Sequence, residues 1–262
     1  MSVRFDVISL FPDAFSSFLK TGIISKSFIE GVTKLFIHNP RNYSLDRYRT
    51  VDDEPYGGGP GMVLKPEPFF KAFESIPDKG KRRVLMMTPQ GKSIIQKDFQ
   101  RWSRYNQLII FCGNYEGFDE RIRSLVDEEI SLGDFVLTGG EIPAMTVING
   151  VVRLLPGTLG SEESLRDESH NELLLEHPQY TRPADYRGLK VPNILLSGNH
   201  SKIKEWRQKQ REVKTKNRRP DLYHLWQSKV GGEDQSRIES LPNLFPKISL
   251  RFELEDDDHM WI

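Results

Sequence analysis

The sequence predicts an α/β fold with a mostly parallel sheet, followed by a small helical C-terminal domain. Two observations predict the sheet: short apolar runs alternate with helical patterns up to Leu155, and glycine-bearing turns directly follow two of the runs. The composition becomes polar and charged near Gly160, which predicts a linker, and a helical pattern beginning at Ser201 predicts the helical part beyond it. We therefore expect a first domain over residues 1–160, a flexible linker over 161–177 and a second domain over 178–262.

The elements of the first domain follow from apolar periodicity. Apolar runs predict strands at Val3–Leu10, Leu35–His38, Arg83–Thr88, Gln107–Cys112 and Glu129–Leu132. Helical spacing predicts helices at Asp13–Lys20, Ile24–Glu30, Pro66–Ser75, Ser93–Tyr105, Asp119–Val126 and Pro143–Leu155. Pro143 lies near the first position of its helix, where proline is best tolerated. Residues 40–62 are polar and irregular, and they end in the glycine-rich sequence YGGGPGM.

The predicted second domain contains a basic helix from Ser201 to about Lys216. Nine Lys or Arg stand against two Glu between Ser201 and Pro220. Ile203, Trp206, Gln210 and Val213 share one face, which we expect to pack inward, so Trp206 is expected in the core rather than on an RNA base. The last residues are acidic, and a solvated surface remains the simplest interpretation of both charge blocks.

Composition and missing motifs exclude several classes of protein. Lys plus Arg and Asp plus Glu are equal at 37, so net charge does not predict a partner. The single cysteine, Cys112, lies in an apolar run, which predicts a buried thiol in a reducing compartment. We expect no secretion signal, no membrane span and a cytoplasmic location. No HExxH, Walker, GxGxxG or GxSxG motif occurs, which disfavours a metal site, a phosphate-binding loop, a nicotinamide enzyme and a serine hydrolase.

Two glycine-bearing stretches follow predicted strands and indicate a small-molecule site. GNYEGFDER begins at Gly113, and SLGDFVLTGGE ends at Glu141. Glycine lets the backbone approach a ligand closely, and open α/β sheets bind ligands at the carboxyl ends of their strands. The sequence therefore predicts a site built largely from backbone. The alternative is that these glycines only make tight turns.

Four such stretches occur in order, namely YGGGPGM, TPQG, GNYEGFDER and GDFVLTGGE, together with FDVISLFP, HPQYTRP and LLSGNH. On these motifs the chain resembles the bacterial tRNA (guanine-N1)-methyltransferases of the SPOUT class over roughly residues 1–220. The resemblance implies a deep trefoil knot, which periodicity cannot show. It also implies methyl transfer from S-adenosylmethionine to N1 of guanosine 37 in tRNA, next to the anticodon. The alternatives are a SPOUT methyltransferase acting on another base or RNA, and an RNA-binding protein without catalysis.

The resemblance implies that S-adenosylmethionine is held mainly by the backbone of three segments. These contain Met86, Met87, Thr88, Pro89 and Gln90; Gly113, Tyr115, Glu116 and Gly117; and Leu132, Gly133, Asp134, Phe135, Val136, Leu137, Gly139, Gly140 and Pro143. Turn backbone supplies fixed donors and acceptors, which suits recognition of an adenine ring.

The resemblance also implies catalytic groups. Glu116 and Arg153 are expected near the methionine end of the cofactor and the target base. Loss of the N1 proton places negative charge on O6 of guanine, which a fixed cation such as Arg153 stabilises. The family has an Asp-Ser pair in the linker as the base, but here the sequence is Asp167-Glu168-Ser169. Glu168 is the preferred base and Asp167 the alternative. Without the resemblance, Arg153 would be a surface charge and the two acids solvated linker charges.

The expected RNA contacts divide between two parts of the chain. Asp52 and the glycines Gly57, Gly58 and Gly59 are expected near the target nucleotide. The basic helix is expected to bind phosphates of the anticodon stem-loop through Lys202, Lys204, Arg207, Lys209 and Arg211. The resemblance further implies a homodimer, in which the linker and second domain of one chain cover the cofactor of the other. The family's enzyme is magnesium-dependent, so Mg²⁺ is a second expected cofactor, although the sequence offers no site for it.

Overall fold

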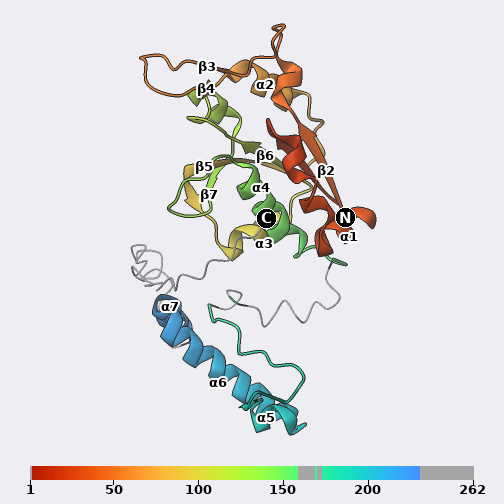
Figure 1. Cartoon of the computed structure of the whole chain (residues 1–262), viewed down its shortest axis with the longest axis vertical. Coiled ribbons are helices and arrows are strands. Elements are labelled where there is room, and N and C mark those ends of the chain that lie inside the picture. The colour runs from red at the N-terminus through yellow and green to blue at the C-terminus, as the bar shows by residue number, and fades with distance from the viewer. Residues whose placement is uncertain (1, 159–168, 170–172, 231–262) are drawn as a thin grey trace. The chain divides into compact units, whose positions relative to one another are not determined.

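The computed structural model describes residues 2–158, 169 and 173–230. The chain divides into two compact units, residues 1–166 and 167–262, which we describe separately (Figure 1). The first unit contains a five-stranded sheet with the order β2-β1-β6-β5-β7. All neighbouring strands in it are parallel. The strands are β1 (Val3–Ile8), β2 (Thr33–His38), β5 (Arg82–Ser93), β6 (Gln107–Cys112) and β7 (Glu128–Ser131).

Apolar side chains cover both faces of the sheet, which explains why its central strands read as continuous apolar runs. Phe5, Leu108 and Ile110 belong to one buried cluster, together with side chains of α1 (Gly22–Ile29), α3 (Gln96–Trp102) and α4 (Glu141–Val152). Ile109 and Phe111 belong to the cluster on the other face, with α2 (Pro66–Glu74). Successive residues of a strand point to opposite faces, so β6 contributes to both clusters.

Some predicted helices are shorter turns, and two predicted strands, β2 and β5, are longer in the structure. Residues 13–20 form two 3₁₀ turns, η1 (Pro12–Phe15) and η2 (Phe18–Lys20). Residues 119–126 contain the 3₁₀ helix η4 (Glu120–Leu125), whose first turn is capped by the Asp119 side chain accepting from the Arg121 amide. β5 continues to Ser93, which leaves fewer residues for α3 than predicted.

The long irregular region predicted at residues 40–62 is largely irregular in the structure. It contains the 3₁₀ helix η3 (Pro40–Tyr43) and the two-residue strand β3 (Asp52–Asp53). β3 pairs antiparallel with β4 (Val63–Leu64), just beyond the glycine-rich sequence. The region is therefore a loop whose two ends are joined by a short ladder.

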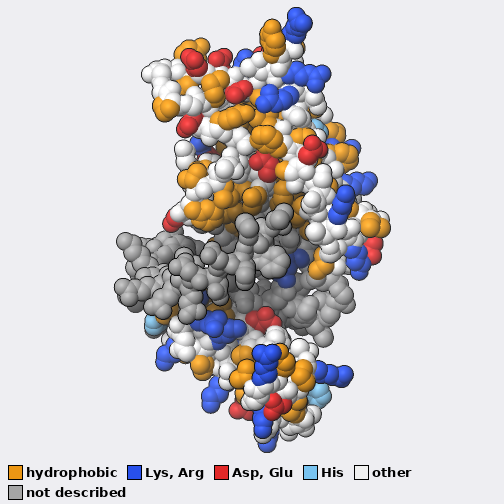
Figure 2. Space-filling model, viewed as in Figure 1, with side chains coloured by type: hydrophobic (Ala, Val, Ile, Leu, Met, Phe, Trp, Pro, Cys, Tyr) orange, Lys and Arg blue, Asp and Glu red, His pale blue; other side chains and the backbone are white. Residues whose placement is uncertain are grey.

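The second unit contains a short hairpin and three helices among its described residues. The hairpin pairs β8 (Asp185–Tyr186) with β9 (Leu189–Lys190), and the helices are α5 (Asn193–Leu196), α6 (His200–Arg218) and α7 (Pro220–Val230). Asn199 caps α6, since its side chain accepts from the Lys202 amide. Lys and Arg side chains are visible over this unit in Figure 2. α6 ends at Arg218, two residues beyond its predicted end at about Lys216.

The inward face of α6 differs from the predicted one. Trp206 is half-buried, but Val213 is 47% exposed, whereas Arg211 and Thr215 are buried. The Thr215 hydroxyl accepts from the Leu175 amide at 2.8 Å. The buried positions are four residues apart and so lie on one face of the helix. The choice of Val213 was therefore wrong because apolar spacing alone did not reveal a buried polar contact.

Charged side chains also join neighbouring strands of the sheet. The buried carboxylate of Asp6 on β1 accepts two hydrogen bonds from Arg4 at 2.7 Å and one from the Gln107 amide nitrogen at 2.7 Å, and it lies 2.9 Å from His38 Nε2. Burial alone would raise the pKa of Asp6, but the hydrogen bonds from His38, Arg4 and Gln107 outweigh it and lower the pKa. This Asp6 network joins β1, β2 and β6.

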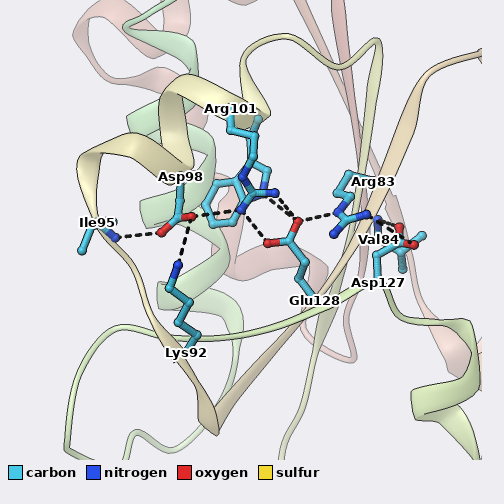
Figure 3. A network of polar contacts seen from close by, with 9 residues as sticks. Arg83, Val84, Lys92, Ile95, Asp98, Arg101, Asp127 and Glu128 are labelled. Atoms are coloured by element: carbon cyan, nitrogen blue, oxygen red, sulfur yellow. Dashed lines mark hydrogen bonds and ion pairs between the residues drawn. The ribbon is translucent and has the colours of Figure 1, made fainter. Parts of the chain in front are cut away.

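A second network surrounds Glu128, the first residue of β7, and Figure 3 shows its carboxylate between Arg83 and Arg101. Arg101 of α3 donates to both carboxylate oxygens, at 2.5 and 2.6 Å, and Arg83 of β5 also donates to it. Burial opposes ionisation of Glu128, yet the hydrogen bonds from Arg101, Arg83 and Trp102 lower its pKa to about 2. This Glu128 network fixes α3 and β5 against the edge strand.

Candidate functional site

The carboxyl ends of the three neighbouring strands β6, β5 and β7 surround a pocket of about 260 Å³. Met87 pairs with Cys112 on one side and with Ile130 on the other, so the three strands are aligned at one row. The segments that follow this row line the pocket: residues 88–90, 113–118 and 131–140. The pocket lies where open α/β sheets bind ligands.

The first segment is a bulge inside β5 rather than the predicted strand-to-helix turn. β5 pairs with Ile130 through Met87 and again through Lys92, so residues 88–91 leave the ladder. A Cβ at Gly91 would collide with the backbone of Glu129 and Ile130, so glycine is required where the chain returns to β7. The bulge thereby carries TPQG to the pocket.

The second and third segments are joined by backbone. Asn114 and Gly139 form an isolated bridge, and the Gly140 amide donates to the Gly113 carbonyl at 2.8 Å. A Cβ at Gly140 would lie 2.7 Å from Cα of Cys112 and 2.9 Å from the Gly113 nitrogen. Gly140 therefore lets the third segment contact the end of β6 directly, although β5 separates β6 from β7 in the sheet.

A buried carboxylate fixes the same junction from the other side. Glu141, the first residue of α4, accepts from the Ser9 hydroxyl at 2.6 Å and from the Asn114 amide at 3.2 Å. A carboxylate in the first turn of a helix also interacts favourably with the helix dipole. Glu141 thereby connects the ends of β1 and β6 to the start of α4.

The glycine-rich loop is attached to the pocket by three backbone hydrogen bonds. The Glu116 amide donates to Met62, the Leu64 amide donates to Gly117 at 2.9 Å, and the Asp119 amide donates to Leu64 at 2.9 Å. A Cβ at Gly61 would collide with the Glu116 side chain. The exposed Gly57, Gly58 and Gly59, all with positive φ, follow β3, which holds the half-buried Asp52.

Most of the residues that the resemblance implied for the cofactor line this one pocket. Those that do so are Met86, Met87, Thr88, Pro89, Gln90, Gly113, Tyr115, Glu116, Gly117, Leu132, Phe135, Val136, Leu137, Gly139, Gly140 and Pro143. Gly133 and Asp134 belong to the third segment but are not among the lining residues. The role of these residues in binding stays a prediction.

Sequence reasoning missed seven lining residues. They are Asn114, Phe118, Glu120, Arg123, Ile130, Ser131 and Thr138. Asn114, Phe118, Glu120, Ser131 and Thr138 lie inside the two glycine-bearing stretches and could have been included with them. Arg123 lies beyond the first stretch, and no sequence signal indicated that η4 would turn it toward the pocket.

The predicted catalytic residues are not all brought together. Glu116 lines the pocket, but Arg153 does not, since it follows the C-terminal end of α4. The pocket lies at the opposite end of this 12-residue helix, which is roughly 18 Å long at 1.5 Å per residue. Within one chain, Arg153 is therefore not placed beside Glu116. Asp167 and Glu168 lie outside the described residues.

The predicted phosphate-binding residues fall into two groups. Lys202, Lys204, Arg207 and Lys209 are exposed on α6. Arg211 is only 5% exposed and lies on the inward face, so its expected role as an open phosphate contact does not fit its position. The reason is the helical period, because Arg211 shares its face with the buried Thr215.

Cys112 is fully buried, and burial raises the pKa of its thiol, as expected for a structural cysteine. In the part of the chain that the structure describes, no group of three or more His, Cys, Asp or Glu side chains is arranged to hold a metal ion. Among the same residues, no helix is both long enough and apolar enough to cross a bilayer.

Comparison with known proteins identifies the family. The family model described as tRNA (guanine-1)-methyltransferase TrmD matches residues 3–225. A tRNA (guanine-N(1)-)-methyltransferase of Synechococcus sp. (strain WH7803) is 61% identical over 234 residues, which cover 89% of this chain and 97% of the relative. That of Synechococcus sp. (strain CC9311) is 62% identical over 225 residues, covering 86% and 94%. That of Synechocystis sp. (strain ATCC 27184 / PCC 6803 / Kazusa) is 54% identical over 227 residues, covering 87% and 98%.

Proposed function

Because this chain belongs to the tRNA (guanine-1)-methyltransferase TrmD family, we propose that it transfers a methyl group from S-adenosylmethionine to N1 of guanosine 37 in tRNA. Methylation of N1 of guanine in tRNA is supported by the family and by the names of the relatives. The position in the tRNA and the methyl donor are the finer parts of the proposal. The observation that carries the methyl donor is the convergence of three glycine-bearing segments on one pocket, and guanosine 37 rests on the family resemblance.

The residues of the pocket fit S-adenosylmethionine. The cofactor supplies a methyl group made electrophilic by the positive charge on sulfur. Apolar side chains such as Met86, Leu137 and Pro143 suit the adenosine moiety, and the exposed backbone of the three segments offers donors and acceptors for its polar edges. Glu116 is the acidic side chain that we propose near the positively charged end.

Removal of the N1 proton requires a base, for which we propose Glu168, with Asp167 as the alternative. A carboxylate within hydrogen-bond reach of N1 accepts the proton, while Arg153 stabilises the charge that develops on O6. Glu168→Gln is expected to lower kcat by about 10²–10³-fold with little change in affinity for S-adenosylmethionine. Asp167→Asn is the matched control, and equal activity of both variants with the wild type would contradict the assignment.

We propose that the active enzyme is a homodimer, which would supply a second chain to the open side of the pocket. Large apolar side chains are exposed around the pocket, including Val136 at 81%, Ile142 at 60% and Phe135 at 54%. Such clusters on soluble proteins are typical of interfaces. Because Arg153 is remote from the pocket of its own chain, its proposed role requires this assembly. Val136→Asp is expected to shift the protein toward monomer in light scattering and to reduce methyl transfer; an unchanged dimer would contradict the proposed interface.

We also propose the deep trefoil knot of the SPOUT class. Threaded connections are essentially absent from protein folds, so this proposal rests on the family, and the contact of the third segment with the end of β6 across β5 is the local feature that fits it.

We propose that the exposed cations of α6 bind phosphates of the anticodon stem-loop. Each lost phosphate contact lowers the salt dependence of binding, log K against log salt, by roughly 0.7–0.9. Lys204→Gln and Arg207→Gln should each lower the slope by about that amount in a tRNA titration. Arg211→Gln serves as comparison: its buried position predicts loss of stability instead, and an equal change of slope in this variant would contradict that distinction.

The decisive test is methyl transfer from labelled S-adenosylmethionine to two unmodified tRNA transcripts, with guanosine or adenosine at position 37. The proposal expects label only on the guanosine transcript, recovered as N1-methylguanosine. Label at another position would contradict the assignment of guanosine 37 and indicate a SPOUT methyltransferase with another target. Cofactor binding without transfer to either transcript would contradict the proposed reaction.

A further inference from the structure

Arg123 joins three elements beside the pocket. It lies on η4, lines the pocket and donates from each of its guanidinium nitrogens to a different acceptor. Nε donates to Glu120 at 2.8 Å, Nη2 donates to the side-chain oxygen of Gln90 at 2.8 Å, and Nη1 donates to Glu129. The acceptors belong to η4, to the bulge of β5 and to β7.

The Gln90 contact matters because the bulge has left the sheet. Residues 88–91 are outside the ladder between β5 and β7, and the Gln90 amide itself has only a long local bond to the Thr88 hydroxyl, at 3.3 Å. Within the described residues, the side-chain hydrogen bond that reaches Thr88–Gln90 from another element comes from Arg123. A rigid guanidinium can hold two carboxylates and an amide in fixed directions, which a single ammonium group cannot.

Arg123 already forms ion pairs within the protein, which distinguishes it from a cation that binds a ligand. Two of its three partners are carboxylates, and its side chain is 25% exposed, so its charge is largely compensated inside the protein. A cation that served the carboxylate of a ligand would need to give up one of these partners. The geometry therefore favours a role in positioning the bulge.

We propose that Arg123 is a positioning residue for the methyl donor: by holding Gln90 it fixes residues 88–90 in the conformation that binds S-adenosylmethionine. This rests on the proposed function, since it assigns a determinant of affinity to the same pocket. Without the hydrogen bond from Arg123, residues 88–90 are free to move. Ordering them when S-adenosylmethionine binds then costs free energy, which weakens the affinity.

Calorimetric titration of the full chain with S-adenosylmethionine tests the proposal. Arg123→Met is expected to raise Kd about tenfold, the size expected for one hydrogen bond to a charged group. Arg123→Lys should fall between this variant and the wild type. At saturating S-adenosylmethionine, the kcat of Arg123→Met for tRNA methylation should differ from that of the wild type by less than about threefold, because the chemical step is unchanged. Arg82→Met is the control, since Arg82 lies at the other end of β5 and pairs with Asp78 at 3.7 Å.

A double-mutant cycle with Gln90→Ala separates positioning from direct contact. If Arg123 acts through Gln90, Arg123→Met should alter Kd by less than about twofold in the Gln90→Ala background. Additive effects would overturn the proposal and make Arg123 a direct ligand contact. A lowered melting temperature with unchanged Kd would overturn it in favour of a purely structural role. Wild-type protein that fails to bind S-adenosylmethionine would overturn the proposed function together with this inference, whereas wild-type binding with an unaffected Arg123→Met variant would overturn the inference alone.

Discussion

Two parts of the same parallel sheet, one away from the pocket and one beside it, are held together by different means. Away from the pocket, the Asp6 and Glu128 networks join neighbouring elements through buried or half-buried charges. At the carboxyl ends of β6 and β7, direct backbone contact, as in the bond from the Gly140 amide to the Gly113 carbonyl, is added to the contacts of the Glu141 carboxylate. Side-chain networks stabilise the part away from the pocket, whereas glycines beside the pocket bring main chain into contact and leave its polar groups near the pocket. Stability and ligand binding should therefore be separable by mutation.

The largest effect is expected at Gly140, where a substitution should reduce both the stability of the fold and the binding of ligand. Its φ of −83° is normal for any residue, so the damage from Gly140→Ala would be steric, from a methyl group 2.7 Å from Cα of Cys112. We expect the free energy of unfolding to fall by about 3 kcal/mol, with loss of measurable S-adenosylmethionine binding. Urea denaturation and calorimetry measure the two quantities.

Gly31→Ala is the matched control for Gly140. Gly31 has a φ of +70° and open space around its Cβ position, so the same change should cost only about 1–2 kcal/mol of backbone strain and leave binding intact. Equal effects at the two glycines would show that close contact at Gly140 is not what matters.

Asp6→Asn should affect stability without affecting binding. The amide cannot compensate the charge of Arg4, so we expect the free energy of unfolding to fall by about 2 kcal/mol. The Kd for S-adenosylmethionine should stay within about twofold of the wild type, because the network lies away from the pocket. A large change in Kd would show that the Asp6 network and the pocket are coupled.

Removing the charge of Glu128 should have the smallest effect on the free energy of unfolding. We expect to detect it in the pH dependence of that free energy. The folded-state pKa of Glu128 is lowered from 4.5 to about 2, so its contribution is complete above pH 4.5 and is lost as the pH falls toward 2. Between about pH 5 and about pH 3, the wild type should lose about 1 kcal/mol more than Glu128→Gln, a value reduced for partial exposure. Parallel pH profiles of unfolding for the two proteins would contradict this.

The sequence predicted the parallel sheet and the segments that border the pocket, because apolar runs and glycines are local signals. β6 has the bounds predicted from its run of apolar residues. The 3₁₀ turns were predicted as helices because apolar spacing does not distinguish a short turn from the start of a longer helix.

Features that depend on tertiary contacts could not be predicted in the same way. The bulge in β5 depends on a second pairing with β7 through Lys92, and the position of Arg123 depends on acceptors from two other elements. Arg211 was assigned to the RNA surface from its charge, whereas its burial depends on which face of α6 packs inward. Long-range partners, rather than residue type, decided each of these cases.

The Glu141 carboxylate also has a consequence for how the chain folds. Its bond to Ser9 joins residues 132 positions apart, and β1 pairs with β6, which lies about a hundred residues later. Contacts this distant in sequence are formed late, because a long loop must be closed before they contribute. The end of β1 is therefore fixed only after the start of α4 has been synthesised. In refolding experiments, competence to bind ligand should return with the slowest phase that restores the native sheet.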